Sequence, residues 1–96
     1  MFNYEKEKPL RDYLVYFGST LGKISVYDDG VVIQTGKKHI PVRTNYVEAL
    51  NRAGGEPILG KVTVELSYFD MFGNREVLEV RMRENDLAAL KSDIGR

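Results

Sequence analysis

The chain has 96 residues, of which 43% are hydrophobic and 29% charged, a composition typical of one globular domain and unlike that of a disordered protein. Fourteen basic residues balance fourteen acidic ones, so no overall field attracts nucleic acid, and we expect no nucleic-acid partner. The absence of cysteine excludes disulfides, thiolate metal sites and cysteine nucleophiles, and fits a cytoplasmic protein. No apolar stretch approaches the roughly 18 residues of a membrane span, so neither a transmembrane segment nor a signal peptide is expected.

Apolar runs between turn residues predict a mainly β (α+β) domain over residues 13–96, preceded by an arm over residues 1–12. Six runs have the aromatic, β-branched or alternating character of strands: residues 13–17, 24–27, 31–35, 38–42, 62–68 and 77–83. Short connections, among them the tight-turn sequence at residues 28–30, predict antiparallel pairing of neighbouring strands. Pro41 cannot donate a ladder hydrogen bond, which places its strand at a sheet edge.

Two helices are predicted. Thr44 or Asn45 can cap a short helix over residues 46–50, which a loop should follow. The chain should finish with an amphipathic helix over residues 85–94, with Asn85 as its N-cap. The apolar residues of this second helix fall on one face: Leu87, Leu90 and Ile94.

The strands over residues 62–68 and 77–83 alternate between apolar and polar residues, so each should bury one face and expose the other. The side chains expected to face water are Thr63, Glu65, Ser67, Glu79, Arg81 and Arg83. A hairpin loop over residues 70–75 should join the two strands.

Together these elements predict a curled antiparallel sheet, or a small barrel of six or seven strands, closed by the C-terminal helix. Four parts of the chain carry a resemblance to a known superfamily by their order and spacing, without a diagnostic motif: the hairpin over residues 22–33, the strand at residues 39–42, the pair at 62–68 and 77–82, and the final helix. In these parts the chain resembles the pleckstrin-homology-like superfamily, in its GRAM or bacterial PH variants. That family usually has seven strands, so the resemblance implies a seventh in the N-terminal arm or before Gly60.

No residue pattern predicts a catalytic, cofactor or metal site. His39 is the only histidine and has no cysteine to complete a transition-metal site. The acidic pair Asp28-Asp29 lies in a turn too short for an EF-hand loop. Residues 18–22 lack the lysine and spacing of a phosphate-binding loop and the pattern of a nucleophile elbow.

Two surface features remain as candidate sites. The first is a basic stretch, which Lys23 could join: Lys37, Lys38, His39 and Arg43. PH-like domains that bind phosphoinositides use basic residues near early hairpins, so the resemblance implies an anion or lipid-headgroup site here; a solvated turn is the simpler interpretation.

The second candidate site is the loop over residues 69–73, with three large apolar side chains: Phe69, Met71 and Phe72. These either fold back over the sheet, the interpretation we favour, or form a contact surface.

The function expected from the sequence is that of a noncatalytic interaction module. It would bind a protein partner or a second copy of itself, through the edge beside Pro41 or the loop over residues 69–73. The alternative is an anion-binding or headgroup-binding module centred on the basic stretch. An enzyme of unknown class is a more distant alternative.

Overall fold

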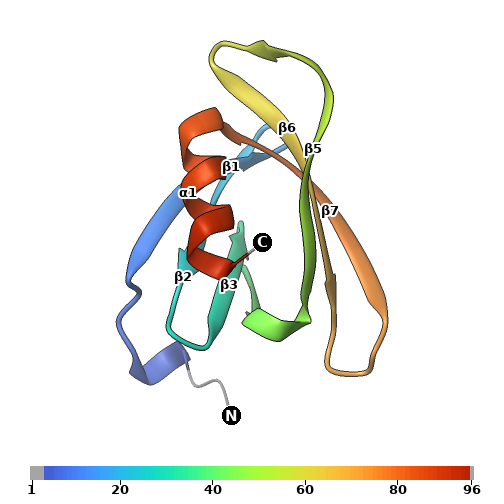
Figure 1. Ribbon diagram of the computed structural model, residues 1–96. Helices are drawn as coiled ribbons and strands as arrows, with labels where there is room; N and C mark the ends of the chain where they lie inside the picture. The colour runs from blue at the N-terminus through green and yellow to red at the C-terminus, as the bar shows by residue number, and fades with distance from the viewer. Residues whose placement is uncertain (1–3, 96) are drawn as a thin grey trace.

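The computed structural model describes residues 4–95 and has a mainly β architecture with one C-terminal helix (Figure 1). Seven antiparallel strands form a single sheet. The strands are β1 (Arg11–Phe17), β2 (Thr20–Val26), β3 (Gly30–Thr35), β4 (Lys38–Arg43), β5 (Val47–Ile58), β6 (Lys61–Phe69) and β7 (Arg75–Arg83). The helices are two 3-10 turns, η1 (Tyr4–Lys6) and η2 (Thr44–Tyr46), and the α-helix α1 (Glu84–Ile94).

The sheet is made of two meanders joined at the first and last strands. Its order is β4-β3-β2-β1-β7-β6-β5, so β4 and β5 are the two edges. β1 and β7 are in register at one position, Tyr16 opposite Arg81, whereas β6 and β7 pair along their whole length. The sheet curls but does not close on itself, and α1 lies across its concave side (Figure 1). The predicted curled antiparallel sheet is therefore present, as an open sheet.

The core follows the alternation expected of half-buried strands. Inward side chains of all seven strands pack into one cluster, including Val15, Ile24 and Val64, each at most 1% exposed. Helix α1 closes this cluster with Leu87, Leu90 and Ile94, as predicted, and ends at Gly95, whose φ of 71° suits a residue without a Cβ.

Helix α1 begins one residue earlier than predicted. Its N-cap is Arg83, which has extended backbone and makes no side-chain cap hydrogen bond, so Asn85 lies inside the first turn. Near the other end, the Asp93 carboxylate accepts hydrogen bonds from Tyr13 Oη at 2.6 Å and Arg11 Nη1 at 3.1 Å. These bonds fix the helix against β1.

The helix predicted over residues 46–50 is wrong. A 3-10 turn ends at Tyr46, and β5 then runs from Val47 to Ile58, through the stretch predicted to be a loop. Two register shifts against β6, between Val47 and Ala49 and between Ala53 and Ile58, accommodate this irregular sequence. A seventh strand therefore precedes Gly60.

Two smaller expectations also differ. Ser67 was expected to face water but is 4% exposed, and it pairs with Ala49 next to the register shift of β5. β1 begins at Arg11, two residues inside the predicted arm. The first three residues of that arm lie outside the described residues.

Candidate functional site

The loop between β6 and β7 is organised by one carboxylate. Asp70 Oδ1 accepts the backbone N–H groups of Phe72 and Asn74, both at 2.9 Å, and Asp70 Oδ2 accepts the Asn74 side-chain amide at 3.3 Å. The two backbones also bond directly, because Asp70 N–H donates to the Asn74 carbonyl at 2.9 Å. Hydrogen bonds from Asn74 and then from Phe72 lower the pKa of Asp70 below its ordinary value. The loop is thus held in one conformation by an Asx-type turn.

This conformation presents the apolar residues of the loop to solvent. Met71 is 83% and Phe72 82% exposed, so the prediction that these side chains fold back over the sheet is wrong for both. Phe69, at the end of β6, is half-buried. The physical reason is the Asp70 network, which satisfies the backbone inside the turn and points the side chains at positions 71 and 72 outward.

Pro41 lies in the edge strand β4, as its chemistry predicted. Thr44 N–H donates to the Asp29 carbonyl at 3.0 Å. This bond shows which opposite residues of β3 and β4 are hydrogen-bonded to each other. Opposite residues alternate between bonded and non-bonded pairs, so Val32 and Pro41 form a non-bonded pair. The ring nitrogen of Pro41 therefore faces the open edge, where it removes a donor that another strand could use.

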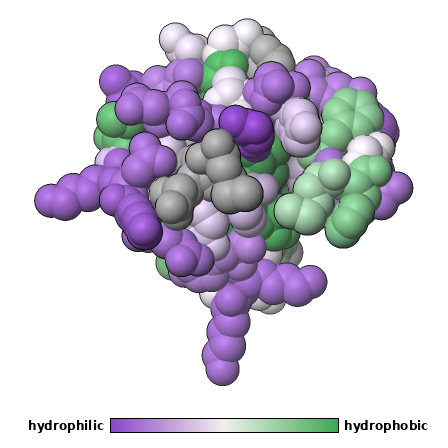
Figure 2. Space-filling model, turned by 90° about the horizontal axis from the view of Figure 1, so that it is seen from below, coloured by the Kyte–Doolittle hydropathy of each residue, from purple (hydrophilic) through white to green (hydrophobic). Residues whose placement is uncertain are grey.

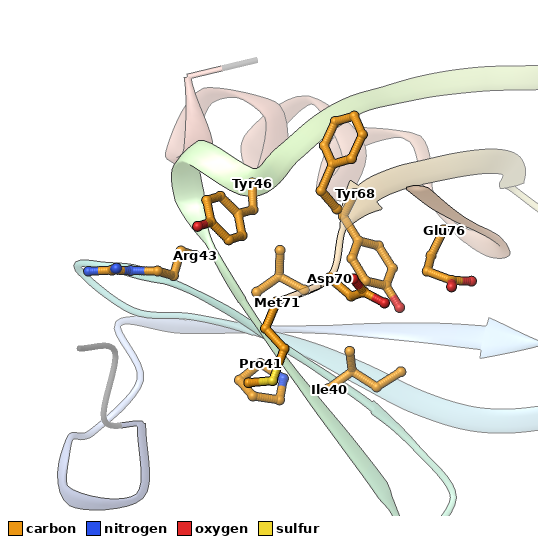
Figure 3. A pocket seen from close by; sticks show the side chains of 10 residues that line it. Ile40, Pro41, Arg43, Tyr46, Tyr68, Asp70, Met71 and Glu76 are labelled. Atoms are coloured by element: carbon orange, nitrogen blue, oxygen red, sulfur yellow. The ribbon is translucent and has the colours of Figure 1, made fainter. Parts of the chain in front are cut away.

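The edge strand and the β6–β7 loop meet at one groove of about 620 Å³ (Figure 3). Its walls come from β4, η2, the end of β6, the loop and the start of β7: Ile40, Pro41, Val42, Arg43, Tyr46, Tyr68, Phe69, Asp70, Met71 and Glu76. Most of these side chains are apolar or aromatic. Figure 2 shows hydrophobic side chains gathered over the β6–β7 loop beside a recess in this end of the molecule.

Charged groups lie at opposite sides of the groove. Arg43 stands beside Tyr46 on one side, and Asp70 and Glu76 stand near Tyr68 on the other (Figure 3). Burial, followed by the charges of Glu76 and Asp70, raises the pKa of the Tyr68 phenol above its ordinary value. The groove thus has an apolar centre, a positive end and a negative end.

The basic stretch predicted as an anion site does not form one cluster. Lys37 and Lys38 lie at the β3–β4 turn, whereas Arg43 ends β4, roughly 17 Å further along an extended strand. Side chains of neighbouring strand residues point to opposite faces, so Lys38 and His39 also diverge. All four side chains are exposed. Of the four, Arg43 lines the groove, and the other three do not.

Sequence reasoning had identified Pro41 and the apolar loop as two separate features. The groove also uses Tyr46, Tyr68 and Glu76, none of which had been singled out. Tyr46 was missed because it was assigned to the predicted helix, whereas it ends a 3-10 turn. Glu76 was missed because a single charged residue on a strand is not a signal of a site. No sequence signal placed these residues together, because the pairing of β5 with β6, which brings Tyr46 to the groove, was not predicted.

Comparisons of the sequence with protein-family models and with curated proteins found no match. Within residues 4–95, no group of three or more metal-ligating side chains is placed to hold an ion. The helices of this part of the chain are all too short or too polar to cross a membrane.

Proposed function

We propose that this chain is a noncatalytic, cytoplasmic interaction module of PH-like type, whose groove beside β4 binds apolar side chains of a protein segment. The observation that carries the proposal is that the two features expected to contact a partner, the edge at Pro41 and the loop at Met71, line the same groove. The PH-like assignment is supported by the element order, with four strands, then three, then a closing helix.

The groove is suited to side-chain insertion more than to strand addition. Its volume falls within the range of roughly 300–1,000 Å³ typical of ligand sites, and its centre is apolar. An added strand would need regular donors along β4, but Pro41 supplies none at the middle of the edge. Met71 forms one wall of the groove, and the Asp70 turn fixes the backbone beside it, so that backbone needs no ordering on binding.

A displayed library of random 12-residue peptides tests this function. We expect enrichment of sequences with aromatic or large aliphatic residues, and loss of their binding in Met71→Asp. Leu14→Asp is the matched control, because Leu14 is also exposed, at 62%, but lies on β1 away from the groove. Failure to enrich any sequence, or equal binding of the enriched peptides by Met71→Asp, would contradict the proposal.

A further inference from the structure

We propose that the occupant of this groove is a second copy of the chain, with Phe72 of each copy inserted into the groove of the other about a two-fold axis. This inference rests on the proposed function and adds the identity of the partner. Three features of the groove and its loop support it: an exposed apolar side chain beside the groove, opposite charges at its two ends, and a geometry that limits the assembly to two copies.

The inserted side chain is available and already positioned. Met71 lines the groove, whereas Phe72, the next residue, is absent from its walls and is 82% exposed. The Phe72 N–H donates to Asp70 Oδ1, so the backbone that carries the ring is fixed before association. A rigid aromatic side chain on an ordered loop loses little conformational entropy on binding, which is the property of interface anchors.

The charges are complementary to a rotated copy of themselves. Arg43 and Glu76 lie at opposite ends of the groove and form no ion pair with another side chain of residues 4–95. A two-fold axis that runs across the groove at its centre exchanges the two ends. Arg43 of one copy then faces Glu76 of the other, and this contact occurs twice. A single partner of one charge sign would match only one end.

The same geometry limits the assembly to two copies. The groove and the Phe72 side chain belong to one continuous surface, so a single two-fold contact uses both and leaves neither free. Because the contact consists of one groove and one inserted side chain from each copy, we expect a reversible dimer, to be sought between about 10 µM and 1 mM.

Sedimentation velocity over this concentration range tests the inference. We expect the wild type and Leu14→Asp to dimerise without larger species, and Phe72→Asp to weaken dimerisation about tenfold or more. Circular dichroism verifies that Phe72→Asp is folded, as its exposure predicts. A wild type that stays monomeric at 1 mM, or a dimer unaffected by Phe72→Asp, would overturn the inference.

A charge exchange distinguishes the two-fold contact from any other. Arg43→Glu and Glu76→Arg should each be monomeric, because like charges then meet twice in each homodimer. An equimolar mixture of the two variants should form a heterodimer, since both contacts again join a cation to an anion. A mixture that stays monomeric, or assembles beyond two copies, contradicts the two-fold arrangement. If the peptides bind the groove but the wild type does not dimerise, the proposed function stands and this inference fails.

Discussion

Leu59 has a backbone conformation that its side chain does not favour. Its φ is 54°, and it forms a two-residue turn with Gly60, φ 76°, between the paired residues Ile58 and Lys61. Turns with positive φ at both positions favour Asn-Gly or Gly-Gly, because a Cβ crowds the backbone there. The Leu59 side chain is also 91% exposed, so no packing offsets this cost.

We therefore predict that Leu59→Asn stabilises the protein by about 1 kcal/mol, since Asn tolerates the left-handed region better than Leu. Urea unfolding followed by circular dichroism measures the free energy of unfolding. Leu10→Asn is the matched control, because Leu10 is 62% exposed and outside any strand, and its effect should stay within about 0.5 kcal/mol of zero. An unchanged or lowered stability of Leu59→Asn would show that the turn carries no strain.

At the scale of elements, the sequence predicted six of the seven strands and the final helix, because their alternation or helical spacing is regular. β5 was missed because Val47 and Leu50 are three residues apart, a spacing that indicates one helix face. In a regular strand two such residues would face opposite sides. The register shift between Val47 and Ala49 changes the alternation, so both residues reach the core, 1% and 2% exposed. Such a shift depends on the partner strand and has no signature in the local sequence.

The candidate site was predictable only where it depends on local sequence. The edge position of Pro41 follows from its missing donor, which is a property of one residue. The outward orientation of Phe72 follows from hydrogen bonds to Asp70 within five residues, so a closer reading of the turn chemistry could have found it. The meeting of the two in one groove depends on β5 pairing with β6, which brings η2 and the loop to the same end of the sheet.

Helix α1 is joined to β1 by the hydrogen bond from Tyr13 to Asp93, which gives a prediction for this contact. Tyr13→Phe should destabilise the protein by about 1.5 kcal/mol at pH 7, because a bond to a carboxylate is lost. Tyr46→Phe is the control, since the Tyr46 side chain is 40% exposed, and it should change stability by less than about 0.5 kcal/mol.

The hydrogen bond from Tyr13 to Asp93 also makes the stability difference between the wild type and Tyr13→Phe depend on pH. Burial and then the hydrogen bond to Asp93 raise the pKa of Tyr13 above its ordinary value of 10.0. Because the folded state holds the proton more tightly than the unfolded chain does, this stabilisation is complete below pH 10 and is lost as the pH rises through the folded pKa. The stability gap between wild type and Tyr13→Phe, measured by urea unfolding from pH 7 to 11, should therefore narrow above pH 10. A gap that stays constant would contradict this role for the phenol.

At the scale of the whole molecule, the open sheet has two edges that other chains could extend. β4 and β5 each end the strand order, so edge-to-edge pairing between copies could continue without limit. The register shifts of β5 make that edge irregular, whereas β4 pairs with β3 without any shift. Pro41 is therefore the main obstacle to strand addition at β4, because its nitrogen faces outward and carries no hydrogen.

Replacing Pro41 by Thr should remove this obstacle and cause open-ended association. The new N–H would face the free edge and cost no bond to β3, so the fold should persist while the concentration at which aggregates appear falls about threefold or more. Light scattering and thioflavin T fluorescence measure the onset. His39→Thr is the matched control: it places the same residue two positions away on β4, where the backbone already has its N–H group. If both variants aggregate alike, β propensity explains the effect; if neither does, another feature protects the edge, and either result contradicts the role assigned to Pro41.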